Sequence, residues 1–201
     1  MKRLAALALG ALAAAGFAPL DAWPLALAGV AGLLWLVARA PGLRGALLLG
    51  WLFGVGHFIA GLSWIATAFY YQDAMPHWLG WIAVALLALY LAVFPALATG
   101  LAWRWREASG RDEIGYVLAF AAAWIVSEWL RAGLFTGFAW NPLGVIWVSA
   151  LPVARAAAWI GTYGLSALAC LAAGALYLMT LGRWRGALAL VAAPLLAFAT
   201  G

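Results

Sequence analysis

The feature that most constrains this chain is a series of long apolar stretches joined by short connections. We count seven of them, at 4–19, 23–38, 46–69, 78–102, 114–131, 157–180 and 186–200. A helix crosses a bilayer core about 30 Å thick with roughly 20 mostly apolar residues. Alanine and leucine are abundant here, without the alternating polarity of membrane β-strands. The sequence therefore predicts an all-α, polytopic membrane helix bundle, in which residues 1–201 form a single transmembrane domain of about seven transmembrane helices.

The few charged residues of this chain are distributed unevenly. They make up 8% of the 201 residues, whereas soluble proteins hold about a quarter. Nine of the eleven basic residues precede the first stretch or follow every second one: Lys2, Arg3, Arg39, Arg44, Arg104, Arg106, Arg111, Arg183 and Arg185. The opposite connections hold only Arg131 and Arg155. The positive-inside rule then predicts a cytoplasmic N-terminus and an external C-terminus. Topology thus explains the net charge of +5, and we expect no nucleic-acid partner.

The first apolar stretch has a second interpretation. The segment MKRLAALALGALAAAGFA combines a basic start, a short apolar run and small residues at its end, which is the pattern of a secretory signal peptide. Its removal would not disturb the charge pattern of the later connections. The charge rule therefore does not decide between a first membrane span and a cleaved segment.

Several other features have ordinary structural explanations. Cys170 lies within an apolar stretch, where we expect a buried, inert thiol. The pair Gly50 and Gly54 forms a GxxxG pattern that favours close helix packing. The connection WRWREASGRDE at 103–113 has the composition of a solvated turn. We find no phosphate-binding loop and no clustered metal ligands, so the sequence predicts no cofactor and no metal.

The external segment at 132–156 is too apolar for a loop in water. Its apolar residues are Leu134, Phe135, Phe138, Trp140, Val145, Ile146, Trp147 and Val148. Gly133, Gly137, Pro142, Gly144 and Pro152 are expected to interrupt a continuous helix. Irregular backbone at membrane depth occurs only where protein buries it or where it lines a cavity. We therefore predict a re-entrant or interfacial segment that folds onto the outer ends of the helices.

Glu128 and Arg131 stand three residues apart just before this segment. On a helix they share one face, so we expect them to pair. One interpretation is an ion pair that only anchors the helix end at the membrane interface. The other is an arginine held by a glutamate to receive an anionic lipid headgroup, with Trp129 and Trp140 beside the acyl chains.

The stretch EWLRAGLFTGFAW resembles the EWLR…LFTGFPW signature of the bacterial apolipoprotein N-acyltransferases. Four further segments resemble the same family, in the same order: GFAPLDAWPLALAGVAGLLWL at 16–36, GWLFGVGHFIAGLSWI at 50–65, ALYLAVFPAL at 88–97 and GTYGLSAL at 161–168. Two positions depart from the family pattern. Ala139 replaces a proline, and Arg155 occupies a place that is usually polar and uncharged.

The resemblance implies a multi-pass protein of the bacterial cytoplasmic membrane that acts in lipoprotein maturation. A phospholipid donates an acyl chain to a cysteine, and a diacylated lipoprotein then accepts that chain on its terminal amino group. The resemblance places the cysteine in an external nitrilase-like domain with a Glu-Lys-Cys triad after the seventh helix. These 201 residues hold no such triad, so we expect the chain alone to bind lipid and not to catalyse. The candidate lipid or substrate contacts are Glu128, Trp129, Arg131, Phe138, Trp140 and Asn141.

Two alternative functions remain open at this point. A small transporter or channel also contains intramembrane charges and glycine-broken segments. The chain shows no inverted repeat between its halves, and no further acidic residue within a span to form a relay. A non-catalytic structural membrane module is the other alternative. Flux across reconstituted membranes would favour a transporter, and a stoichiometric partner without lipid specificity would favour a structural module.

Overall fold

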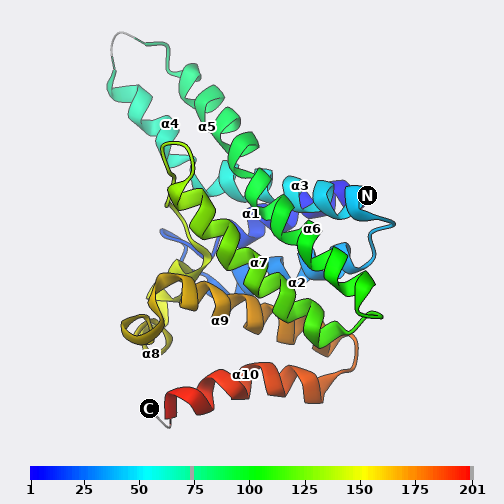
Figure 1. The fold of residues 1–201 in the computed structure, drawn as a ribbon. Helices are drawn as coiled ribbons and strands as arrows, with labels where there is room; N and C mark the ends of the chain where they lie inside the picture. The colour runs from blue at the N-terminus through cyan, green and yellow to red at the C-terminus, as the bar shows by residue number, and fades with distance from the viewer. Residues whose placement is uncertain (73–74, 200–201) are drawn as a thin grey trace.

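A computed structural model describes residues 1–72 and 75–199 of the chain, and these residues form helices without any β-strand (Figure 1). The α-helices are α1 (Lys2–Ala14), α2 (Trp23–Ala38), α3 (Leu43–Gly61), α4 (Trp64–Ala68), α5 (Trp78–Leu91), α6 (Val93–Ala108), α7 (Glu113–Gly133), α8 (Leu151–Ala154), α9 (Ala157–Thr180) and α10 (Trp184–Ala199). Two 3₁₀-helices, η1 (Phe69–Tyr71) and η2 (Leu143–Ser149), complete them.

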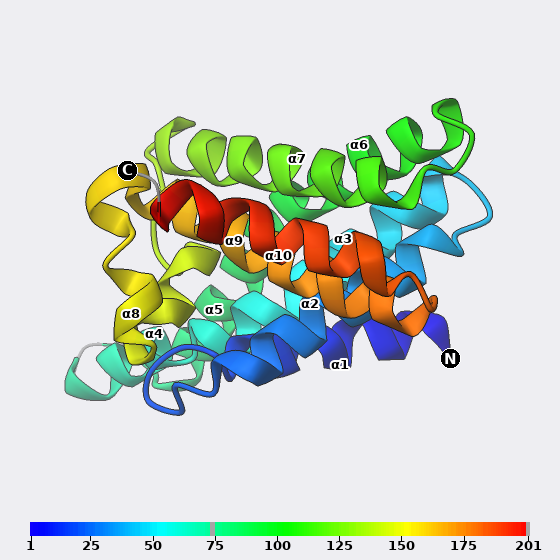
Figure 2. The ribbon, with the colours of Figure 1, turned by 90° about the horizontal axis from the view of Figure 1, so that it is seen from below.

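The long helices run roughly alongside one another and pack into one bundle (Figure 2). Helix α3 packs on α1 and α6, α7 packs on α6 and α9, and α10 packs on α9. The centre is apolar and fully buried at Leu33, Phe53, Phe120 and Leu178. The core therefore draws on helices from both halves of the chain.

Gly50 and Gly54 lie where α3 approaches α6. A Cβ atom on Gly54 would lie 2.8 Å from the Cα of Ala92, and one on Gly50 would meet the Thr99 side chain and the Pro95 carbonyl. Only glycine leaves room for this approach of two backbones. The close helix packing predicted from the GxxxG pattern is thus confirmed.

Four helical stretches are long and apolar enough to cross a membrane: Leu43–Tyr71, Trp78–Ala108, Glu113–Gly133 and Ala157–Thr180. Trp23–Ala38 is a shorter apolar helix. These helices confirm a polytopic membrane helix bundle of the all-α class. The first helix ends at Ala14, earlier than the predicted 4–19, because residues 15–22 form a turn before α2.

The membrane-spanning stretch Trp78–Ala108 is divided at Ala92 into α5 and α6. Pro95 explains the break, because it has no N–H for the carbonyl of Leu91 and its ring crowds that carbonyl. Helices α4 and α5 project together from one end of the bundle (Figure 1). Exposed aromatic side chains cover this projection, among them Trp64, Tyr71 and Trp78, as is common where helices meet the membrane–water interface.

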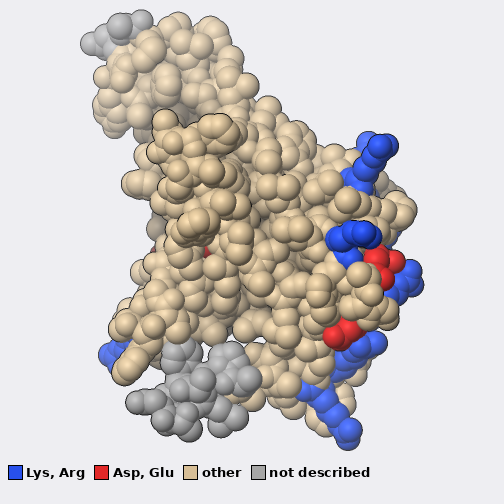
Figure 3. Space-filling model, in the orientation of Figure 1, with Lys and Arg blue, Asp and Glu red and all other residues tan. Residues whose placement is uncertain are grey.

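Most of the basic side chains gather at the end of the bundle that holds the N-terminus and the turns α6–α7 and α9–α10 (Figure 3). The prediction of a solvated turn at 103–113 is wrong for two of its residues. Helix α6 extends to Ala108, and Arg106 and Glu113 are buried. Glu113 pairs with Arg106 and accepts a 2.6 Å hydrogen bond from the hydroxyl of Tyr177 on α9. Packing of α6, α7 and α9 therefore removes this pair from solvent.

Candidate functional site

The C-terminal end of α7, named its outer end from here on, carries two buried ionisable side chains, Glu128 and Arg131, which are 4% and 3% exposed. Among the residues that the structure describes, no ion pair joins them, so the predicted direct pairing is wrong. Each side chain instead contacts the backbone of the segment that follows the helix. Each side chain forms a hydrogen bond with a different backbone group of that segment.

Glu128 is held by hydrogen bonds to one of its two carboxylate oxygens. The Oε1 atom accepts from the indole Nε1 of Trp124 at 2.9 Å and from the backbone N–H of Leu143 at 2.7 Å. Trp124 lies one turn earlier on α7, so the helix itself orients the carboxylate. The other oxygen, Oε2, is buried and forms no hydrogen bond of good geometry among the described residues, and the hydroxyl of Ser166 lies near the carboxylate.

Arg131 donates from Nη1 to the carbonyl of Trp140 at 2.6 Å, and its guanidinium carbon lies 5.3 Å from the ring centre of Phe58. A guanidinium has five N–H groups. This is the one hydrogen bond of the Arg131 side chain within the described part of the chain. The remaining N–H groups therefore have donor capacity for a ligand.

A cavity of about 230 Å³ lies beside these two side chains. Its walls are formed by Glu128, Arg131, Ala139, Pro142, Thr162 and Tyr163. The lining therefore comes from α7, from the irregular segment and from the start of α9. It brings a carboxylate and a guanidinium to one space without neutralising either by a direct bond.

The irregular segment between α7 and η2 has an unusual backbone. Phe135, Gly137 and Asn141 have φ angles of 56°, 73° and 52°. The left-handed region is costly for a bulky residue such as Phe135, and such residues often occur at functional sites. The amide of Asn141 donates to the carbonyl of Gly61 at 3.1 Å, which ties the segment to the end of α3.

Helix η2 then returns the chain between α7 and α9. Gly144 donates to Ser166 Oγ at 2.8 Å, and Trp147 Nε1 donates to the carbonyl of Leu165 at 3.1 Å. Gly144 lies inside η2, a short 3₁₀-helix, and no continuous helix runs through residues 134–150. The role of Gly144 is close packing, because a Cβ there would lie 2.5 Å from the carbonyl oxygen of Thr162.

The structure distributes the six predicted contact residues unequally around the cavity. Glu128 and Arg131 line it, and Trp140 and Asn141 hold its walls through the hydrogen bonds above. Phe138 is half-buried against Phe58 and its neighbours. Trp129 is 62% exposed and does not line this cavity. Sequence reasoning missed Trp124, Thr162 and Tyr163, since only the fold brings α9 to α7.

Comparisons with known proteins agree with the resemblance seen in the sequence. A family model described as the apolipoprotein N-acyltransferase N-terminal domain matches residues 9–175. An apolipoprotein N-acyltransferase of Ralstonia nicotianae is 43% identical over 86% of this chain and 33% of its own length. Those of Nitrosomonas europaea and Chromobacterium violaceum are 40% and 33% identical, over 85% and 98% of this chain. The chain spans about a third of the length of these relatives.

Proposed function

Because this chain belongs to the apolipoprotein N-acyltransferase family, we propose that it forms the lipid-binding membrane part of such an enzyme in the bacterial inner membrane. The cavity between α7, the segment 134–142 and α9 would hold the headgroup of a substrate lipid. The single observation that carries this proposal is the pair of buried, mutually unpaired charges that line one cavity.

The chemistry of the cavity favours a headgroup that carries both signs of charge. Arg131 offers unused N–H groups, which bind a phosphate through two parallel hydrogen bonds. Glu128 has an unused oxygen that accepts a hydrogen bond from an ammonium group. A zwitterionic phospholipid offers a phosphate to Arg131 and an ammonium group to Glu128. The terminal amino group of a diacylated lipoprotein would bind Glu128 in the same way, with the phosphate of a neighbouring lipid on Arg131. The proposed ligands are therefore the phospholipid acyl donor and the lipoprotein acceptor.

A purely structural role for the two charges is the competing explanation. Glu128 and Arg131 bind backbone groups of Leu143 and Trp140, so they hold the irregular segment in place. A clamp of this kind needs one oxygen and one N–H group. A clamp gives no role to the second oxygen of Glu128 or to the remaining N–H groups of Arg131, whereas a bound headgroup would form hydrogen bonds with both.

The orientation of the chain is part of the proposal. The basic end of the bundle would face the cytoplasm, and the cavity at the opposite end would open toward the outer leaflet (Figure 3). The whole enzyme would then transfer an acyl chain on the external side. Cys170, the one cysteine of this chain, is fully buried, so we expect the 201 residues alone to bind lipid and not to form a thioester. Acyl transfer to a diacylated lipopeptide by the purified chain would contradict this expectation.

The test compares Arg131→Lys with Arg106→Lys in the purified chain. Lysine keeps the charge and one hydrogen bond but not the planar fork of arginine. We expect Arg131→Lys to weaken binding of phosphatidylethanolamine about tenfold, measured as the lipid-bound fraction by native mass spectrometry, with nearly unchanged stability. Arg106→Lys should reduce stability and leave lipid binding intact.

The same substitution in a full-length relative that carries the EWLR stretch tests the link to catalysis. Acyl transfer at equal expression should fall with Arg131→Lys and not with Arg106→Lys. Parental lipid binding in the Arg131→Lys chain, together with parental acyl transfer in the relative, would leave the two charges as a clamp only.

A further inference from the structure

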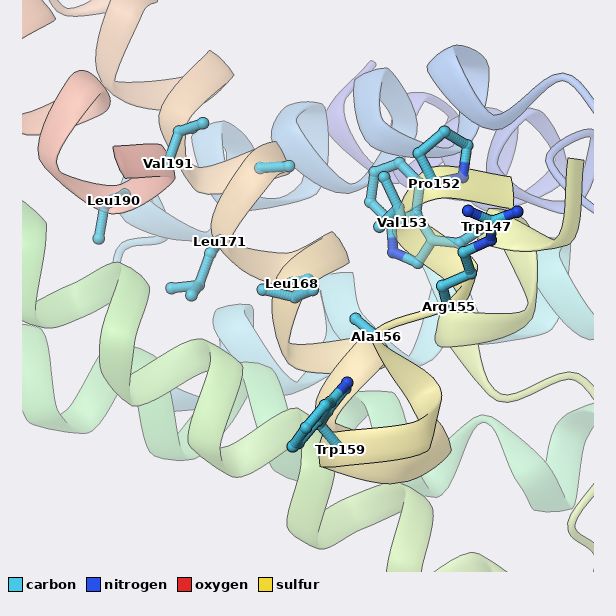
Figure 4. Close-up of a pocket in the computed structure, with 11 residues that line it drawn as sticks. Trp147, Pro152, Val153, Arg155, Ala156, Trp159, Leu168, Leu171, Leu190 and Val191 are labelled. Atoms are coloured by element: carbon cyan, nitrogen blue, oxygen red, sulfur yellow. The ribbon is translucent and has the colours of Figure 1, made fainter. Parts of the chain in front are cut away.

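A second and larger cavity lies on the other side of α9. It measures about 420 Å³, within the usual range of ligand sites. Its walls are apolar, with Leu168 and Leu171 on α9 facing Leu190 on α10 and Trp147 closing one side (Figure 4). No carboxylate is among the described residues that line it.

This cavity is separate from the site that contains Glu128 and Arg131. Thr162 and Tyr163 line the first cavity, whereas Leu168 and Leu171 line the second. At 3.6 residues per turn, the two pairs lie on opposite faces of α9. Among the residues whose side chains are described, none lines both cavities. A ligand in one therefore does not occupy the other.

The volume of the second cavity is within the range of sites that bind small ligands. Its lining residues include Ala156, just before α9, and Ala172 within α9. Helix α9 is interrupted at Gly161, whose φ of 66° separates its first turn from the rest. An apolar space of about 420 Å³ along both parts of α9 suits an acyl chain.

Arg155 lies at the outer end of this apolar space (Figure 4). Its side chain is exposed, and it forms no ion pair or side-chain hydrogen bond with the residues whose side chains the structure describes, 1–72 and 75–192. It is also one of the two basic residues on the predicted external side. A guanidinium at the mouth of an apolar cavity, without an acidic neighbour in the lining, matches a phosphate above an acyl chain.

We propose that this cavity binds an anionic phospholipid of the outer leaflet, with one acyl chain between α9 and α10 and the phosphate on Arg155. A zwitterionic headgroup fits less well, since the lining offers no carboxylate for its ammonium group. This second lipid site goes beyond the proposed substrate site, which contains both a carboxylate and a guanidinium.

The test measures binding of phosphatidylglycerol and phosphatidylcholine to the purified chain by native mass spectrometry. We expect the parent to bind phosphatidylglycerol at least about fivefold more tightly, and Arg155→Gln to lose this preference. Arg185→Gln removes a charge at the opposite end of the bundle, and this control should keep the preference for phosphatidylglycerol. Arg131→Lys should also keep it, which separates this site from the substrate site.

A second variant tests the cavity and not the charge. Ala172→Phe places a ring in the cavity and should weaken binding of both lipids, whereas Ala158→Phe, at an exposed position near the start of the same helix, should not. An unchanged phosphatidylglycerol preference in Arg155→Gln would overturn the role of Arg155. Parental binding of both lipids in Ala172→Phe would overturn the cavity as the site.

Discussion

A glutamate and an arginine are buried at each end of α7, and their hydrogen bonds differ between the two ends. The N-terminal end, where Arg106 of α6 meets Glu113, is named the inner end, and the C-terminal end is the outer end. At the inner end, Arg106 donates to both oxygens of Glu113, and the hydroxyl of Tyr177 donates to one of them. Arg106 also donates to the carbonyl of Ala38. At the outer end, Glu128 has one oxygen without a partner among the described residues, and no ion pair joins it to Arg131.

This difference separates a structural pair from a candidate binding site. Burying a charge is costly unless partners compensate it, and the inner cluster finds all of its partners within the fold. The outer end retains unsatisfied polar groups beside a cavity. Such groups are uncommon in native proteins and call for an explanation such as a ligand. The comparison teaches that completeness of the partners, more than burial of the charges, distinguishes the two ends.

The largest expected difference between the two ends is their accessibility across a membrane. Ser109 and Thr136 are exposed, one at each end of α7. In a Cys170→Ala background, a cysteine at Thr136 should react fully with an impermeant thiol reagent added to intact cells. A cysteine at Ser109 should react only after the membrane is opened. The reverse pattern would invert the proposed orientation.

Removing the cation of the inner cluster should have the largest effect on stability. Arg106→Gln leaves Glu113 buried without its counter-charge, and we expect the free energy of unfolding in detergent to fall by about 3–5 kcal/mol. Arg111→Gln is the control, because Arg111 is mostly exposed and its ion pair with Glu107 contributes under about 1 kcal/mol. Equal losses for the two variants would mean that burial does not strengthen the inner pair.

Two glycines in comparable turns test how tightly each end is packed. Gly110 and Gly137 have φ angles of 68° and 73°, so alanine is strained at both. A Cβ on Gly110 meets nothing within 4 Å, whereas one on Gly137 would lie 2.5 Å from the carbonyl oxygen of Ala132. We expect Gly110→Ala to reduce the free energy of unfolding by about 1 kcal/mol, and Gly137→Ala by about 2–3 kcal/mol. Similar losses in the free energy of unfolding for both variants would show that the backbone around Gly137 rearranges to accommodate the methyl group.

The smallest expected effect on stability comes from the outer carboxylate. In Glu128→Gln, the amide oxygen still accepts hydrogen bonds from Trp124 and Leu143, so we expect a change under about 1 kcal/mol. Phosphatidylethanolamine binding should nevertheless weaken, because the amide cannot pair with an ammonium group. Glu113→Gln should lower stability by about 1.5–3 kcal/mol without affecting lipid binding. Weaker lipid binding in Glu113→Gln, together with a larger loss of stability in Glu128→Gln, would contradict the assigned roles of the two ends.

Much of the fold could be predicted from the sequence, because its signals are local. The apolar stretches predict helices at 23–38 and 157–180, and the structure has them at the same residues. Loss of one N–H group explains the break before Pro95, and the small residues at Gly50 and Gly54 predict close packing. Each of these effects depends on a few residues near in sequence, so pattern and composition are sufficient.

The sites depended on contacts that no local pattern contains. The i, i+3 spacing predicts that Glu128 and Arg131 pair, but their partners are backbone groups of Leu143 and Trp140. The charge-rich turn predicts solvent exposure, but Tyr177 reaches Glu113 from a helix 64 residues away. The amino-acid sequence by itself determined that this protein lies in a membrane, that it is helical, and that its basic residues are concentrated in alternate connections. Only the tertiary structure decided which buried charges are neutralised, because backbone donors and distant side chains leave no periodic signal in the chain.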